Sequence, residues 1–281
     1  MIVYQCEDSL ESIFTAIYNS YQEHRDHNDT RICLDQEYYL FAEYVPVTAD
    51  REKAAKVIRT LKRRFGEADY QSICYALSAP DGDKAQAVYQ TIVKGLAKGT
   101  RQGHLLDNLT DDDCNRAFAL SRAAGREANH LYGFLRFEEV QNGILYAKIG
   151  PKNNLLTFLM PHFADRFPME NFIIYDDKRN LFAVHPAGQE WYLMSGQGLH
   201  LTSEQEGEST SEGETEYAEE GTEQYSCSNQ KKGLVISDKE QQIQELFRHF
   251  CRSIAIKERE NRKLQQNMLP LRFQEYMLEF K

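Results

Sequence analysis

Residues able to do acid, base or phosphate chemistry concentrate between Arg126 and Arg179, at junctions between helical and strand-like segments. A scaffold can aim several side chains at one place from such junctions. Two histidines, His130 and His162, suggest a general acid or base, with a carboxylate orienting the imidazole. The candidate catalytic residues are Glu127, His130, His162, Asp165 and Asp176. Their pattern matches no catalytic signature that would name a reaction.

Structural roles for the same residues remain open. Glu127 and His130, three apart, resemble half of a di-iron carboxylate motif, but the sequence has no second Glu-x-x-His pair. We therefore predict no metal and no cofactor, and a salt bridge or hydrogen bond on a helix surface is the alternative. His162, Asp165 and Arg166 can share one helical face. In the alternative interpretation, Asp165 and Arg166 pair with Arg179 and Asp176 and lock a helix to a hairpin.

Basic residues are clustered although the formal net charge is -10. Nine glutamates and no Lys or Arg lie between residues 203 and 225, so the remainder of the chain carries -10 + 9 = -1. The global charge therefore does not exclude a phosphate-binding face. The candidate nucleic-acid contacts are Lys56, Arg59, Arg63, Arg126, Arg166, Arg179, Arg252, Arg259 and Arg262. A solvated basic helix face is the alternative for the first three.

The elements that position these residues can be predicted from local signals. A short strand over 1–5, a helix that starts at the capping-box pattern of 8–11 and a helix over 50–65 are predicted near the N-terminus. A helix from Thr110 leads to two predicted hairpins, 134–149 and 172–184, and a helix lies between these hairpins. This order predicts an α+β fold: a helical N-terminal part, a central antiparallel sheet of two hairpins with flanking helices, and a C-terminal basic helix packing on that core.

Composition divides the chain further. The predicted parts are 1–105, a mostly helical subdomain; 106–200, the central core; 201–233, a disordered acidic insertion; and 234–281, a basic helical segment. No run approaches the roughly 20 apolar residues of a membrane span, and the first residues have no signal-peptide pattern, so we predict a cytoplasmic protein without a membrane partner. Six scattered cysteines without a Cys-x-x-Cys pair indicate reduced thiols.

Several segments together carry a family resemblance. They are Arg126-Glu127-x-x-His130, Gly133-Phe134-Leu135-Arg136-Phe137, Pro161-His162-Phe163-Ala164-Asp165-Arg166-Phe167, Tyr175-Asp176-x-x-Arg179 and Ile254-Ala255-Ile256-Lys257-Glu258-Arg259-x-Asn261. They resemble a bacterial family associated with DNA repair or DNA metabolism, whose domain has no assigned function. Related copies are fused to uracil-DNA-glycosylase-like domains, and members are linked with a radical-SAM protein associated with DNA repair. The chain departs from the family at Phe172, where a Trp is expected, and at 270–274, which lacks an extra basic residue and a Trp.

The resemblance implies a pathway and leaves the reaction open. Our leading hypothesis is a DNA-binding accessory factor that acts with the radical-SAM partner. One alternative is a nuclease or hydrolase acting on damaged DNA, with His130 and His162 as acid, base or metal ligands. Another is a protein-protein adaptor whose acidic insertion docks a partner.

Overall fold

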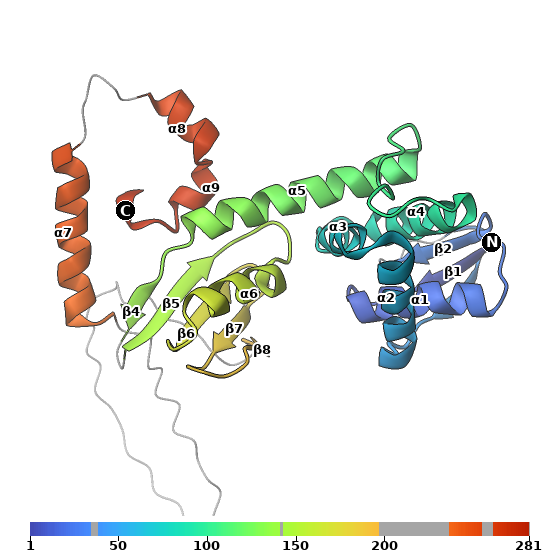
Figure 1. Ribbon diagram of the computed structural model, residues 1–281, viewed down its shortest axis with the longest axis horizontal. Helices are drawn as coiled ribbons and strands as arrows, with labels where there is room; N and C mark the ends of the chain where they lie inside the picture. The colour runs from blue at the N-terminus through green and yellow to red at the C-terminus, as the bar shows by residue number, and fades with distance from the viewer. Residues whose placement is uncertain (35–38, 141–142, 197–235, 255–260, 281) are drawn as a thin grey trace, which may run out of the picture. The chain divides into compact units, whose positions relative to one another are not determined.

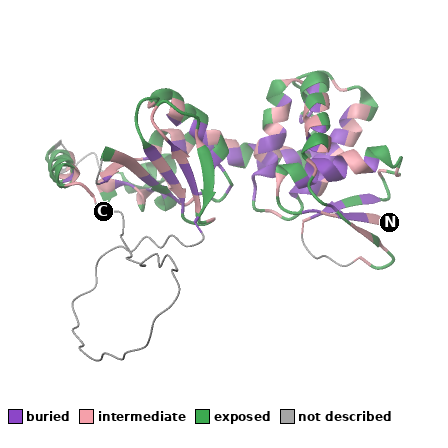
Figure 2. Ribbon diagram, turned by 90° about the horizontal axis from the view of Figure 1, so that it is seen from below, coloured by how far each residue is buried: buried purple, intermediate pink, exposed green. Residues whose placement is uncertain are grey.

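The computed structural model describes residues 1–34, 39–140, 143–196, 236–254 and 261–280 (Figure 1). The predicted acidic insertion lies outside these ranges. The chain forms two compact units. The first consists of Met1–Phe134 and Pro151–His162, and the second consists of Leu135–Gly150 and Phe163–Lys281. The predicted α+β class is confirmed. In each unit, buried residues lie on both strands and helices (Figure 2).

A small parallel sheet opens the first unit. Strand β1 (Ile2–Gln5) lies between β2 (Thr30–Cys33) and β3 (Glu43–Pro46), and both neighbours run parallel to it. Parallel neighbours need a crossover, and helix α1 (Leu10–Gln22) connects β1 to β2. The central strand is buried, with Val3 and Tyr4 at 0% exposure.

Five helices form most of the first unit. After α1 come α2 (Arg51–Phe65), α3 (Glu67–Leu77), α4 (Lys84–Lys98) and α5 (Asp112–Phe134). The side chain of Ser9 accepts a hydrogen bond from Ser12 N, and that of Asp50 accepts from Glu52 N and Lys53 N, which confirms two predicted helix starts. Helix α1 packs on α2, and α5 packs on α3 and α4 around one apolar core.

The second unit contains a five-stranded sheet in the order β4-β5-β6-β7-β8. Its strands are Glu138–Val140, Ile144–Ile149, Phe172–Asp176, Leu181–His185 and Tyr192–Ser195. Both predicted hairpins are present, as the antiparallel pairs β4–β5 and β6–β7. The sheet is mixed, however, because β5 and β6 run parallel, so the prediction of an antiparallel sheet is wrong at this junction. Helix α6 (Leu156–Arg166), which continues through Pro161, lies between β5 and β6 in the sequence and allows this crossover.

The predicted first hairpin strand also began too early, because α5 continues to Phe134. In the second unit, the ring of Phe137 packs edge-on against Phe163, Phe167 and Phe172, with ring centroids 5.4, 5.7 and 5.5 Å away. Phe172, at the position where the family resemblance predicts a Trp, is fully buried. The Phe172 side chain is therefore part of an aromatic core.

The C-terminal helices follow in the second unit as α7 (Asp238–Ile254), α8 (Arg262–Met268), α9 (Leu271–Gln274) and the short η3 (Leu278–Phe280). Residues 237–240 have the Ser-x-x-Glu capping-box pattern, and Ser237 Oγ accepts from Glu240 N. Ser237 N donates to Glu139 O on β4. Arg136 donates to Glu279 Oε1 from both Nε and Nη2, at 3.2 and 3.1 Å. These contacts attach the C-terminal segment to the β4 side of the sheet.

Candidate nucleic-acid interface

Glu127 is buried on α5, with 1% of its surface exposed. Its Oε1 accepts from Lys152 N at 3.0 Å, and its Oε2 accepts from Asn153 N at 2.9 Å and from Asn153 Nδ2 at 2.6 Å. The carboxylate therefore satisfies two backbone donors of the segment that precedes α6. This geometry gives Glu127 a positioning role in the fold and leaves little of its surface for a substrate.

Asp176 is fully buried at the end of β6. Its Oδ1 accepts from Lys178 N and Arg179 N at 3.0 and 3.3 Å, and its Oδ2 accepts from Arg179 Nη1 at 3.0 Å. Asp176 thus pairs with Arg179 of its own turn, and the expected pairing with Arg166 does not form. Burial raises the pKa of Asp176, and this effect exceeds the lowering by the Arg179 guanidinium and the backbone donors.

The two candidate histidines lie in different surroundings within the first unit. The ring of His130 stacks on Phe134, one turn further along α5, with centroids 5.6 Å apart. The exposed His162 lies beside Tyr132, at 4.7 Å between centroids. Residues two apart on a helix do not face the same side, so His162 lies on a different side of α5 from His130. The pairing of the two histidines as an acid and a base, and with it the hydrolase alternative, stays a prediction.

Other predicted contacts are exposed. Asp165 and Arg166 lie on the surface of the second unit, with Arg166 over the ring of Phe167. Arg126 and Arg262 are also exposed. The side chain of Arg252 and the whole of Arg259 lie outside the described residues.

The predicted basic side of α2 is present as an exposed row of Lys56, Arg59 and Arg63, which we call the α2 stripe. Helix α2 carries seven Lys or Arg residues and one acidic residue, Glu52, which gives +7 - 1 = +6. In the part of the chain that the structure describes, no carboxylate lies within ion-pair distance of the stripe. The field of the stripe is therefore not neutralised by the fold.

The surface around the stripe is hollowed in two places. Lys56, Arg59, Thr60 and Arg63 line an open depression of about 370 Å³. A second hollow, of about 210 Å³, lies between α1, α2 and α4 and shares Lys56 and Thr60 with the first. Two tyrosines of α1, Tyr18 and Tyr21, line this second hollow.

Sequence reasoning missed this second hollow. The helical spacing of Leu10, Ile13, Phe14, Ile17 and Tyr21 predicts that Tyr21 lies on an apolar helix face, and this pattern does not include Tyr18. A spacing pattern within α1 cannot show that α2 brings cations to Tyr18, so no sequence signal identified the residue.

Residues 82–279 match a family described as a domain of unknown function, DUF4130. The chain belongs to this family. No curated protein and no solved structure matches the chain.

The DUF4130 match includes the candidate residues from Arg126 to Arg179 and most of the C-terminal helices, whereas the α2 stripe precedes it. Of the residues around the second hollow, only Ile92 and Leu96 fall within the matched region. The α2 stripe therefore belongs to the part of the first unit that lies outside the match.

Within the described ranges, no group of three or more His, Cys, Asp and Glu side chains is arranged to hold a metal ion. Among the helices in those same ranges, none has both the length and the apolar character needed to cross a membrane.

Proposed function

We propose that this chain is a DNA-binding accessory protein of DNA repair or DNA metabolism, acting with a partner enzyme of the radical-SAM type. The observation that carries DNA binding is the α2 stripe, three exposed cations without a carboxylate neighbour among the described residues. The assignment to DNA repair and the radical-SAM partner rest on the family resemblance of the segments between Arg126 and Arg179 and of residues 254–261.

The dimensions of the stripe suit a phosphate backbone. Lys56 and Arg63 are seven residues apart on α2, which corresponds to about 10 Å along the helix axis. Phosphates of one DNA strand follow one another at about 3.4 Å along the duplex axis, so the stripe spans about three of them. Arginine suits this role because its guanidinium matches phosphate oxygens with two parallel hydrogen bonds.

The test is equilibrium binding of the full chain to fluorescently labelled single- and double-stranded DNA over a series of salt concentrations. We expect the logarithm of affinity to fall linearly with the logarithm of salt concentration, because bound cations release counterions. The variant Arg59→Ala/Arg63→Ala should bind at least about tenfold more weakly at physiological salt, with a slope smaller by about 1.5.

The control variant removes the same charge from the same helix. Arg51 and Lys62 are exposed residues of α2 that lie off the stripe, and Lys62 forms an ion pair with Glu67. Arg51→Ala/Lys62→Ala should therefore change affinity much less than Arg59→Ala/Arg63→Ala. Equal losses in the two variants would mean that only net charge matters. Binding that is absent or insensitive to salt would exclude the proposed function.

A protein-binding role has a separate observation in its favour. Helix α7 exposes large apolar side chains, with Leu246 at 70% and Phe250 at 54% exposure among the described residues. Exposed apolar surface of this kind marks interaction sites. Co-purification of the radical-SAM enzyme with wild-type chain, and its loss in Leu246→Glu/Phe250→Glu, would support an adaptor. The exposed Lys239→Ala on the same helix is the control, and unchanged co-purification in the double variant would exclude this surface.

A further inference from the structure

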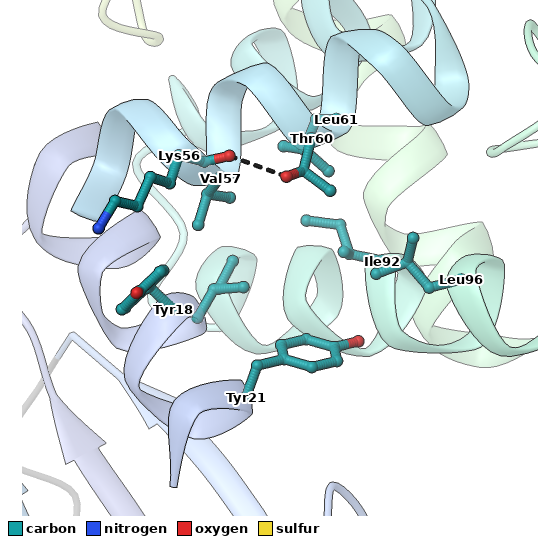
Figure 3. A pocket seen from close by; sticks show the side chains of 9 residues that line it. Tyr18, Tyr21, Lys56, Val57, Thr60, Leu61, Ile92 and Leu96 are labelled. Carbon is teal, nitrogen blue, oxygen red and sulfur yellow. Dashed lines mark hydrogen bonds between the residues drawn. The ribbon is translucent and has the colours of Figure 1, made fainter. Parts of the chain in front are cut away.

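The hollow between α1, α2 and α4 is lined mainly by carbon atoms (Figure 3). Its lining residues are Ile17, Tyr18, Tyr21, Lys56, Val57, Thr60, Leu61, Ile92 and Leu96. The hydroxyl of Thr60 donates to Lys56 O at 2.9 Å, so this polar group is already used by the helix. The hollow thus offers an apolar, aromatic-edged surface with few groups that could read hydrogen-bonding edges.

Tyr18 has an unusual electrostatic environment for an aromatic ring. The Nζ atoms of Lys53 and Lys56 lie 5.8 and 5.3 Å from its ring centroid. Lys53 Nζ is also held by Asn19 Oδ1 at 2.9 Å, whereas Lys56 is exposed at the rim. Cation-π attraction keeps both ammonium groups close to the ring. A ligand that contacts Tyr18 therefore also meets positive charge.

Continuity between the hollow and the α2 stripe defines the ligand chemistry. Lys56 and Thr60 line both the hollow and the depression that contains Arg59 and Arg63. A flat apolar ring joined to an anionic backbone would place its ring against the tyrosines and its phosphates on the stripe. Bases in a duplex are stacked and paired, so the ring must come from a single strand or an unpaired nucleotide.

We propose that this hollow receives the base of an unpaired DNA nucleotide whose neighbouring phosphates lie along Lys56, Arg59 and Arg63. The inference rests on the proposed DNA-binding function and adds the form of DNA and the place of the base. Because the lining has few free polar groups, binding is tolerant of sequence, as is usual when bases stack on aromatic side chains. The stripe supplies the electrostatic part of the affinity and the hollow supplies a base-dependent part.

The test separates base from phosphate. Binding of full-length chain is measured by fluorescence anisotropy with a labelled oligothymidylate and with an abasic oligomer that has the same number of phosphates. Wild-type protein should bind the oligothymidylate about tenfold more tightly, because stacking of a base on an aromatic side chain is lost in the abasic strand. Tyr18→Ala should remove this preference, and Tyr18→Phe should retain it.

Three more variants keep the test decisive. Tyr192→Ala removes an exposed tyrosine from β8 in the second unit and should leave the preference intact. Thr60→Phe should fill the hollow from its rim and remove the preference, which gives a result even when Tyr18→Ala does not fold. Arg59→Ala/Arg63→Ala should weaken binding of both oligomers and keep their ratio.

The outcomes distinguish the two levels of the proposal. Equal binding of both oligomers by the wild-type chain, with salt dependence, overturns the base-binding hollow and leaves DNA binding standing. Binding of neither oligomer overturns the DNA-binding function together with the hollow. Retention of the preference in both Tyr18→Ala and Thr60→Phe places the base elsewhere. Displacement of the oligothymidylate by laurate but not by thymidine monophosphate would instead assign the hollow to amphiphilic anions and overturn the inference.

Discussion

The polar residues between Arg126 and Arg179 and the basic residues of α2 are both rich in ionisable groups, but they differ in how those groups are used. The carboxylates of Glu127 and Asp176 are at 1% and 0% exposure, and each accepts hydrogen bonds from two backbone N–H groups. Lys56, Arg59 and Arg63 are exposed and have no carboxylate neighbour in the described part of the chain. The first group maintains the fold, and the second is available to a partner.

Burial explains this difference. A buried charge is costly unless hydrogen bonds or an opposite charge compensate it inside the protein. The satisfied carboxylates therefore have little capacity left for a ligand. Exposed cations carry no such cost and keep their long-range field. Sequence spacing alone makes both groups candidates for a functional site, so the sharpest tests ask whether the first controls stability and the second controls binding.

Loss of the Glu127 carboxylate should have the largest effect on stability. Glu127→Ala leaves the N–H groups of Lys152 and Asn153 and the Asn153 amide without this acceptor in a buried site. Each unsatisfied buried donor costs about 1–3 kcal/mol, so we expect a loss of about 3–5 kcal/mol in the free energy of unfolding. Urea denaturation measures this loss.

Arg126→Ala is the matched control because it changes the preceding, exposed residue of the same helix. Its free energy of unfolding should stay within about 0.5 kcal/mol of wild type. A Glu127→Ala protein as stable as Arg126→Ala would contradict a structural role for Glu127 and would return that residue to the catalytic candidates.

The Asp176–Arg179 pair should give the next largest effect. Arg179→Ala leaves the buried Asp176 carboxylate with only its two backbone donors. Breaking a buried ion pair by removing one partner costs about 3 kcal/mol. Thermal or urea unfolding tests this, with the exposed neighbour Lys178→Ala as the control. Equal stability of the two variants would show that the pair contributes nothing to the fold.

Much of the fold could be predicted because its signals are local. Ser9, Asp50 and Ser237 each cap a helix through a backbone N–H two or three residues ahead. The parallel pairing of β5 and β6 could not be predicted in this way. Each hairpin specifies its own antiparallel pair, but no signal in either one sets how the two hairpins join. Strand β8 has four exposed residues and lacks the apolar alternation that would identify it.

The candidate site was predictable only in part, because several of its residues make their contacts with residues far away in the sequence. The α2 stripe follows from spacing within one helix. Glu127 is paired with residues 25 and 26 positions away, and helix spacing offered only His130 as its neighbour. Tyr18 acquires its two ammonium neighbours from α2, so its role depends on how two helices pack.

The pH dependence of stability gives a smaller test at Asp176. Burial raises the pKa of this carboxyl in the folded protein above its ordinary value of 3.8. At pH values between the ordinary pKa and the raised pKa of Asp176, the folded state binds more protons than the unfolded state. The contribution of this carboxyl to the free energy of unfolding therefore falls as pH rises. Above the raised pKa the contribution is constant.

Urea denaturation of wild type and Asp176→Asn at a series of pH values isolates that contribution. The stability of wild type relative to Asp176→Asn should be greatest at low pH and should decline as pH rises from about 4. In Arg179→Ala the decline should extend to higher pH, because the guanidinium lowers the pKa of Asp176. A relative stability that increases with pH in this range would mean that the ion pair outweighs burial.

The smallest expected change in stability comes from the α2 stripe. Lys56, Arg59 and Arg63 repel one another at three- and four-residue spacing on one helix, and they have no buried partner to leave unsatisfied. The variant Lys56→Ala/Arg59→Ala/Arg63→Ala should therefore unfold within about 0.5 kcal/mol of wild type, or be slightly more stable. The same protein should have lost most of its affinity for DNA.

This combination is the reverse of the one expected for Glu127→Ala, which should lose stability and, under conditions where it is folded, keep its affinity for DNA. Urea denaturation and anisotropy binding on the same preparations would compare the two directly. A stripe variant that loses several kcal/mol of stability, or that binds DNA as wild type does, would show that exposure without a carboxylate neighbour is not sufficient to identify a binding surface in this chain. Retained stability with lost binding would assign the phosphate contacts to α2 rather than to the residues between Arg126 and Arg179.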